Sequence, residues 1–174
     1  MANLKECVLQ VQIELQTQFW KTLINRLKLE GYDVSENSIS EKQINEYYTS
    51  SKKNKYYGIE IRFSANDIVS FRYGIRIDHN IYGGFTLREG VEKKNEINLK
   101  PEYKKYADIV KSIDAKYVNN EYWLGWKGLQ PRLNFRNINE ETCKNLSNLE
   151  DTISIMVRNI TDEIKFFKDS VNDN

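Results

Sequence analysis

The sequence contains few of the residues that build metal, disulfide or nucleotide sites. There is one histidine, His79, and there are two cysteines, Cys7 and Cys143. A lone histidine cannot supply a two-histidine metal site, and two distant cysteines are too few for a disulfide scaffold. No GxxxxGK[ST], GxGxxG or HExxH pattern occurs. His79 lies between Asp78 and Asn80, and we interpret it either as a solvated turn residue or as a single general base.

The chain also lacks a long apolar run and an excess of charge of one sign. No run approaches the roughly 18–20 apolar residues that a membrane helix needs. The first residues do not have the basic-then-apolar layout of a signal peptide. Lysine and arginine number 26 against 25 acidic residues, so the net charge of +1 creates no global attraction for nucleic acid or membrane. We therefore predict a cytoplasmic protein with no membrane association, no cofactor and no metal ion.

What the sequence does contain is many residues with AT-rich codons. There are 19 Asn, 18 Ile and 18 Lys, but only 8 Arg, 4 Ala and 2 Pro. This bias is typical of a low-GC bacterium or of its phage. The 174 residues favour a single domain covering residues 1–174, with a core of ordinary size.

The first thirty residues carry two competing periodicities. Residues 9–15 alternate apolar and polar side chains as a strand would, whereas a stripe from Leu4 to Leu27 steps by three or four residues as a helix does. No Gly or Pro interrupts residues 1–30. We therefore predict one long helix over residues 4–30, which ends at Gly31.

The middle of the chain has the alternation of an antiparallel meander. Three strands are predicted near residues 57–63, 69–77 and 85–87, and the turn-forming segments SAND and DHN follow the first and the second of them. Helices are predicted over residues 41–48, 101–113, 139–146 and 149–167, and residues 117–138 are predicted to be irregular. This order indicates an α+β fold, with a meander of three or slightly more strands and the helices packed on one face. The predicted core contains Phe19, Leu23, Leu27, Ile59, Ile61, Phe71, Ile75, Met156, Ile160 and Ile164.

Three segments resemble a known group of proteins. They are residues 9–27, residues 121–135 (EYWLGWKGLQPRLNF) and residues 149–167 (LEDTISIMVRNITDEIKFF). In this order they are similar to the C-terminal accessory region of bacterial and phage proteins of the PD-(D/E)XK nuclease superfamily. Members of that superfamily bind a metal ion through an upstream aspartate and a Glu/Asp-x-Lys on adjacent strands. The nearest match here, Glu60-Ile61-Arg62, has arginine in place of the lysine, so the resemblance implies an accessory part without the nuclease centre.

Strand parity predicts a second, polar face of the meander. If Ile59 and Ile61 face the core, Glu60 faces away from it, and so do four arginines on the three strands: Arg62, Arg72, Arg76 and Arg88. Lysine outnumbers arginine 18 to 8 in the chain, yet all four basic residues here are arginine. Arginine binds carboxylate or phosphate in a bidentate way and stacks on bases. Either this face contacts an anionic partner, or the arginines are used internally, in cross-strand pairs with Glu60 and Asp78 or under cover of the N-terminal helix.

A second group of aromatic and basic residues follows the meander. The candidate binding residues of this segment are Trp123, Trp126, Lys127, Arg132 and Arg136. Aromatic rings with interleaved cations can stack bases, grip phosphates or anchor a protein partner. The alternative is that the two tryptophans, three residues apart, fasten an irregular segment to the core.

These residues leave two classes of function open. The first is a non-catalytic binding protein whose partner is a protein, for example a nuclease or nuclease complex, or RNA or DNA. An inhibitor of a defence nuclease, of the anti-CRISPR or immunity-protein type, fits the size and the absent chemistry. The second is a divergent metal-dependent nuclease or its substrate-binding domain, which would need carboxylates from the set Glu60, Asp67, Asp78 and Glu89 to converge. No catalytic residue is predicted.

Overall fold

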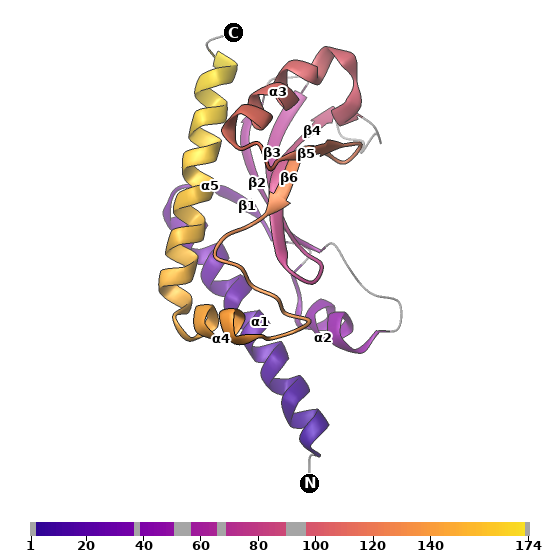
Figure 1. Ribbon diagram of the computed structural model, residues 1–174, viewed down its shortest axis with the longest axis vertical. Coiled ribbons are helices and arrows are strands. Elements are labelled where there is room, and N and C mark those ends of the chain that lie inside the picture. Colours follow the sequence, from indigo (N-terminus) through magenta and orange to yellow (C-terminus); the bar gives the residue numbers. More distant parts are fainter. Residues whose placement is uncertain (1–2, 37–38, 51–56, 66–68, 90–96, 173–174) are drawn as a thin grey trace.

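The computed structural model describes residues 3–36, 39–50, 57–65, 69–89 and 97–172, and these form an α+β fold (Figure 1). A long N-terminal helix, a six-stranded antiparallel sheet and C-terminal helices follow one another along the chain. The predicted fold class is therefore confirmed. Within these residues, no helix is both long and apolar enough to cross a membrane.

Helix α1 (Leu4–Leu29) follows the helical stripe rather than the strand alternation. The backbone N–H of Glu6 donates to Asn3 Oδ1, and the backbone N–H of Asn3 donates to the carboxylate of Glu6, which completes a capping box. The helix ends where Gly31 takes a positive φ of 87°. Its first half extends beyond the body of the molecule (Figure 1) and carries exposed apolar residues: Leu4, Val8 and Val11.

The sheet has the strand order β1-β2-β3-β4-β6-β5, and every neighbouring pair is antiparallel. Its strands are β1 (Asp33–Ser35), β2 (Gly58–Ala65), β3 (Val69–Ile77), β4 (Ile81–Glu89), β5 (Val118–Asn120) and β6 (Trp123–Gly128). The predicted meander is the central part, β2-β3-β4. Residues 117–138 were predicted to be irregular, and this was wrong for β5 and β6, which extend the sheet beyond β4.

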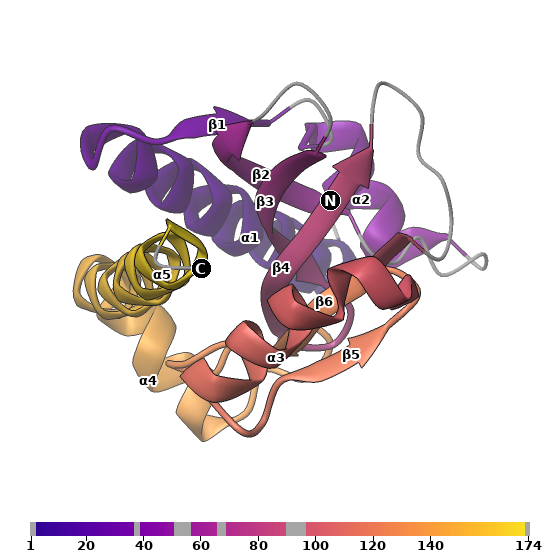
Figure 2. The same cartoon turned by 90° about the horizontal axis from the view of Figure 1, so that it is seen from above.

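The other helices are α2 (Glu41–Thr49), α3 (Lys104–Ile113), α4 (Glu140–Ser147) and α5 (Leu149–Asn172). Helix α3 follows the 3-10 turns η1 (Ile97–Leu99) and η2 (Pro101–Tyr103), and Pro101 stands in the first turn of η2. Ser40 caps α2 and Asn139 caps α4. Seen from above, α1 and α5 lie side by side along one face of the sheet (Figure 2).

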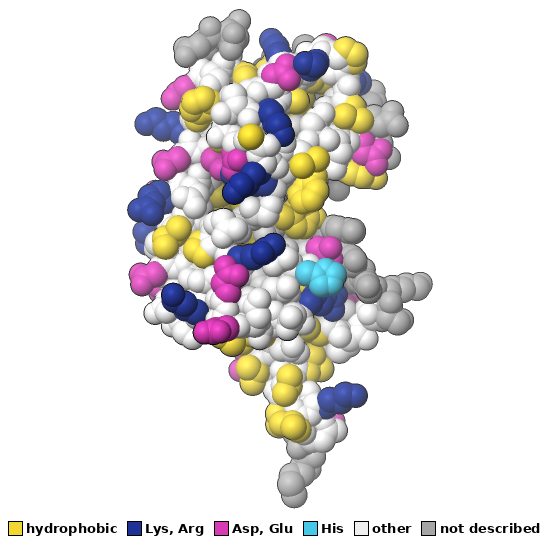
Figure 3. All heavy atoms as spheres, in the orientation of Figure 1, with side chains coloured by type: hydrophobic (Ala, Val, Ile, Leu, Met, Phe, Trp, Pro, Cys, Tyr) yellow, Lys and Arg dark blue, Asp and Glu magenta, His cyan; other side chains and the backbone are white. Residues whose placement is uncertain are grey.

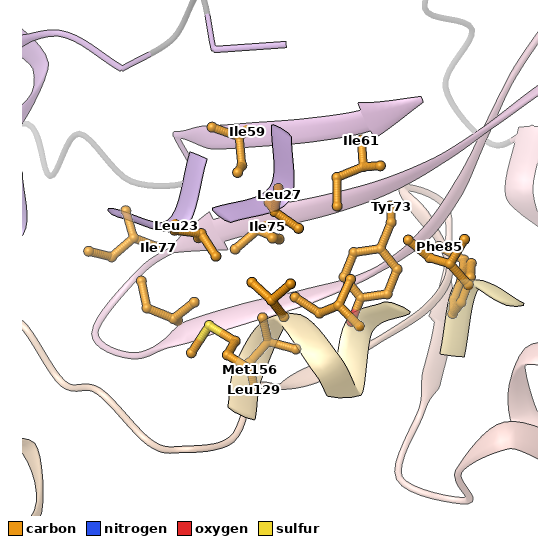
Figure 4. Close-up of a cluster of buried hydrophobic side chains, with 14 of the residues drawn as sticks. Leu23, Leu27, Ile59, Ile61, Tyr73, Ile75, Ile77, Phe85, Leu129 and Met156 are labelled. Atoms are coloured by element: carbon orange, nitrogen blue, oxygen red, sulfur yellow. The ribbon is translucent and has the colours of Figure 1, made fainter. Parts of the chain in front are cut away.

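The core lies between this pair of helices and the sheet. Leu23 and Leu27 of α1 and Met156 of α5 point at the isoleucines of β2 and β3 (Figure 4). All ten residues predicted for the core are buried, with at most 5% of their surface exposed. Phe167 of α5 packs against three phenylalanines of the strands, and its ring lies 4.8 Å from that of Phe85. We call the covered side of the sheet the inner face, and the opposite side the outer face.

Candidate binding face of the sheet

The outer face takes its residues from strand alternation. Ile59 and Ile61 of β2 are fully buried toward the helices, so Glu60 and Arg62 point to the opposite side. On β3 and β4 the register continues this parity, because Arg62 lies opposite Arg72, and Arg76 lies opposite Tyr82. The sequence prediction that four arginines share one face is therefore consistent with the pairing of the strands.

Three of the four arginines converge on a single carboxylate. Glu60 Oε2 accepts from Arg72 Nη1 at 2.7 Å, and Glu60 Oε1 accepts from Arg76 Nη2 at 2.7 Å and from Arg88 Nη2 at 2.5 Å. Only 10% of the Glu60 side chain is exposed, against 16%, 19% and 24% of the arginines. The internal pairing with Glu60 that the sequence left open is thus present. It lies on the outer face, away from α1.

The electrostatics of this cluster favour the charged carboxylate. Burial raises the pKa of Glu60, but the hydrogen bond from Arg72 and the charges of Arg76 and Arg88 outweigh it, so the pKa lies below its ordinary value. The pKa of Arg88 is lowered, because burial and the neighbouring guanidinium groups outweigh the attraction of Glu60. One negative charge therefore holds three positive charges, and the cluster keeps a surplus of two.

Hydrogen-bond donors are also in surplus. Each guanidinium carries five N–H groups, whereas a carboxylate offers about four acceptor positions. Arg76 also donates from Nη1 to the carbonyl of Ile59 at 2.6 Å. Within the described part of the chain, Arg72 Nε is buried without a hydrogen-bond partner. Glu60 alone cannot use all the donors that surround it.

A strip formed by two paired glycines, Gly74 of β3 and Gly84 of β4, lies beside the arginines. Across the sheet Glu60 pairs with Gly74, Gly74 with Gly84, and Gly84 with Trp126. The ring of Trp123 occupies the space above this strip, since a Cβ atom on Gly74 would lie 2.7 Å from Trp123 Cη2. The same Cβ position would lie 3.8 Å from Arg76 Cζ, so the indole and this guanidinium are neighbours.

Both tryptophans contact Tyr82 of β4. The ring centroids lie 6.0 Å apart for Tyr82 and Trp123, and 5.6 Å apart for Tyr82 and Trp126. In a regular strand, two residues three positions apart point to opposite faces, and Trp123 and Trp126 would do so. The pairing of β5 and β6 shifts register between Val118 and Asn120, which allows both rings to lie on the outer face. The three rings are each partly exposed and form an aromatic group at the β6 side of the outer face.

The outer face is therefore made of Glu60, Arg62, Arg72, Arg76, Arg88, Tyr82, Trp123 and Trp126. Arg62 is exposed, and Asp33 of β1 lies directly opposite it in the register. Figure 3 shows the molecule hollowed on one side above the histidine, with hydrophobic side chains along the hollow. Arginines and aromatic rings on one open sheet are a combination that can contact phosphate groups and planar bases, or an acidic protein surface.

The remaining predicted site residues lie elsewhere. Arg136 stacks on the Tyr47 ring, with its Cζ atom 3.6 Å from the ring centroid. Arg132 is exposed in the segment between β6 and α4, where its carbonyl accepts from Asn145. Lys127 pairs in register with Gly83 and points to the inner face. The structure thus separates these three residues from the six that share the outer face.

Lys127 belongs to a second polar cluster on the inner face. Its Nζ lies 2.8 Å from Asp114 Oδ2 and 2.5 Å from Glu163 Oε1. Tyr117 donates to Glu163 Oε2 at 2.5 Å, and Lys127 Nζ lies 4.5 Å from the centre of the Tyr117 ring. Burial lowers the pKa of Lys127, but hydrogen bonds to Asp114 and Glu163 outweigh it and raise the pKa above its ordinary value. This cluster joins α3, β6 and α5.

The carboxylates proposed for a metal site do not assemble in the described part of the chain. Glu60 is surrounded by guanidinium groups, and Asp78 lies 3.3 Å from the ring of His79. Asp67 and the side chain of Glu89 lie outside the described residues. No group of three or more His, Cys, Asp or Glu side chains suited to a metal ion occurs among the described residues.

The sequence interpretation omitted Tyr82 from the outer face. Tyr82 has the same parity as Gly84, Thr86 and Arg88, but the third strand was predicted to start only after the two glycines. The continuous alternation from Ile81 to Leu87 would have included it, had Gly83 and Gly84 been accepted inside a strand.

Comparisons with protein-family models, with curated proteins and with solved structures gave no match to this chain. The similarity of residues 9–27, 121–135 and 149–167 to the nuclease superfamily therefore stays an expectation.

Proposed function

We propose that the chain is a non-catalytic binding protein that contacts an anionic macromolecule through the outer face. The observation that carries this proposal is the convergence of Arg72, Arg76 and Arg88 on one carboxylate, that of Glu60. The cluster has two positive charges and several N–H groups more than Glu60 balances. Because the net charge of the whole chain is only +1, the attraction must come from this local surplus.

The biological setting that we propose is the cytoplasm of a bacterium, or of a host cell if the gene belongs to a phage. The AT-rich codon bias supports this setting, and so does the similarity to accessory regions of nuclease-superfamily proteins. Within it, inhibition or regulation of a defence nuclease is the role that we propose.

The alternative function is a divergent metal-dependent nuclease or its substrate-binding domain. Glu60 is poorly placed to bind a metal ion, because its oxygens already accept hydrogen bonds from three guanidinium groups and these groups would repel a cation. Incubation with plasmid, single-stranded DNA and RNA in Mg²⁺ or Mn²⁺ should therefore show no cleavage. Cleavage that disappears in Glu60→Ala would establish the alternative.

Retention on immobilised heparin tests the proposed function with a polyanion that contains no bases. The test variant is E60Q/R72Q/R76Q, which removes one negative and two positive charges together and so leaves no lone buried carboxylate. The matched control is Arg158→Gln, an exposed residue of α5 whose loss changes the net charge by the same amount. We expect the wild-type protein and the control to elute at higher salt than the triple variant. Equal elution of all three would contradict a binding role for the outer face.

A further inference from the structure

We propose that the anionic partner is a single-stranded nucleic acid, with phosphates at the arginines and bases on the aromatic group. This inference rests on the proposed function and names the partner of the same face. In the outer face the cationic group and the aromatic group lie side by side, because Arg76 pairs in register with Tyr82 and neighbours the ring of Trp123. A single strand can contact both groups at once, because each nucleotide offers one charged phosphate and one planar base.

The phosphate contacts are assigned to the arginine cluster. Arg72, Arg76 and Arg88 are held in place by Glu60, so they need no reordering when a ligand arrives. They remain partly exposed, at 16% to 24% of their side-chain surface. A phosphate has several acceptor oxygens and complements planar guanidinium groups better than it complements point charges.

The base contacts are assigned to Trp123, Trp126 and Tyr82. The Trp123 ring lies over Gly74, where the missing side chain leaves room for it, and it neighbours Arg76. Trp126 lies at the far end of the strip that begins at Glu60. Four adjacent strands span roughly 14 Å at the usual strand spacing, so the face has room for a few nucleotides.

The geometry favours a single strand over a duplex and over a protein. In a duplex the bases stack on one another and cannot lie on protein rings, so the aromatic group would have no role. An acidic protein would engage the arginines and could also use the rings as anchors, whereas a single strand supplies a planar base beside each phosphate. A partner that lacks bases therefore becomes one of the outcomes that the experiment must separate.

The experiment uses the emission of the tryptophans themselves. Trp20 is fully buried in the core, so in a Trp20→Phe variant the emission comes only from Trp123 and Trp126. The probes are a ten-nucleotide oligothymidine, a ten-nucleotide oligouridine, a duplex of the same length, and heparin. We expect either single strand to quench the emission of Trp20→Phe, and its affinity to fall as salt is added. The duplex and heparin should quench it several-fold less.

Two further variants separate base stacking from charge. In W123F/W126F the remaining emission comes from Trp20 and should not respond to any probe, while fluorescence anisotropy of a labelled oligothymidine should show about tenfold weaker binding. E60Q/R72Q/R76Q should weaken binding of the same oligothymidine by at least tenfold, and Arg158→Gln should not. Should Trp20→Phe fail to fold, the difference between the wild-type protein and W123F/W126F reports the same quenching.

Three results would overturn this inference. The first is heparin retention that depends on the arginines, without quenching by either single strand; the proposed function would survive, and the partner would be a protein or another polyanion. The second is single-strand binding that is unchanged in both W123F/W126F and E60Q/R72Q/R76Q. The third is no retention on heparin and no binding of any oligonucleotide, in which case the proposed function fails as well.

Discussion

The two faces of the sheet each contain a charged cluster, and the two clusters have opposite composition. On the outer face one carboxylate, Glu60, holds three arginines, whereas on the inner face one amine, Lys127, holds the two carboxylates Asp114 and Glu163. The inner cluster is completed by Tyr117, which donates to Glu163. In the outer cluster Arg76 also donates to the carbonyl of Ile59, but Arg72 Nε has no hydrogen-bond partner within the described residues. The difference indicates that the inner cluster serves the fold and that the outer one is available for a partner.

The largest effect is expected from Glu60→Gln. This substitution keeps the shape of the side chain but leaves three partly buried guanidinium groups without a counter-charge. We expect the free energy of unfolding to fall by about 3 kcal/mol, the usual cost of removing one partner from a buried ion pair. Urea denaturation at neutral pH measures it.

Two controls sharpen this prediction. E60Q/R72Q/R76Q should be more stable than Glu60→Gln alone, because it removes repelling charges; lower stability of the triple variant would contradict the argument. In addition, the pKa of Glu60 is lowered in the folded state, so its contribution is present above its ordinary pKa of 4.5 and is lost as the pH falls through the folded value. The difference between the wild-type protein and Glu60→Gln should therefore persist at pH 6 and shrink below about pH 4.

A smaller loss is expected from Lys127→Met, which breaks the inner cluster. Glu163 would lose its cation while its side chain stays 85% buried, since only 15% is exposed in the fold. We expect a loss of about 2 kcal/mol at pH 7, because Asp114 is more exposed and can be hydrated. Urea denaturation of the wild-type protein and of Lys127→Met at pH 7 measures this loss.

Lys104→Met is the matched control for the inner cluster. Lys104 pairs with Asp108 on the surface of α3, and 75% of its side chain is exposed. Such a pair contributes less than about 0.5 kcal/mol, so thermal and urea denaturation should barely change. A loss equal to that of Lys127→Met would mean that burial does not distinguish the two lysines.

The smallest effect with a specific readout is expected from Gly74→Ala. The new methyl group would lie 2.7 Å from Trp123 Cη2, so the indole ring must move. Because only the far end of a side chain has to shift, the cost should be about 1 kcal/mol. In the Trp20→Phe background the emission maximum should change with this substitution. An unchanged emission spectrum would show that Trp123 does not lie over the strip.

The part of the outer face on β2 and β3 could be predicted from the alternation of apolar and polar residues along these strands. From Gly58 to Phe63 β2 pairs with β3 without a register shift, and both strands have isoleucines on one side. The direction of Glu60 and of Arg62, Arg72 and Arg76 therefore followed from parity alone. The convergence of three arginines on one carboxylate could not be predicted, because it depends on the twist and register of three strands. The alternation along a strand predicts the face of the sheet on which a side chain lies, but it does not predict which side chains of the other strands contact it.

The β6 side of the face could not be predicted. β5 has three residues, and the register shift beside it turns both Trp123 and Trp126 outward while Lys127 points inward. No local pattern distinguishes this arrangement from an irregular segment. Arg136 shows the same limit, since its stacking on Tyr47 joins residues that are far apart in the sequence.

The first half of α1 has a consequence for the dynamics of the molecule. Leu23 and Leu27 are fully buried, whereas Leu4 is 81% exposed and Val11 is 53% exposed, so one continuous helix passes from the core into solvent. Its early turns are held by the Asn3 cap and by their own backbone hydrogen bonds. Amide hydrogens should therefore exchange within a short time near Cys7 and only through global unfolding near Leu23. A single helix would then have a first part that unfolds locally and a second part that unfolds only with the whole protein. The protection of its amide hydrogens against exchange would rise from the first part to the second.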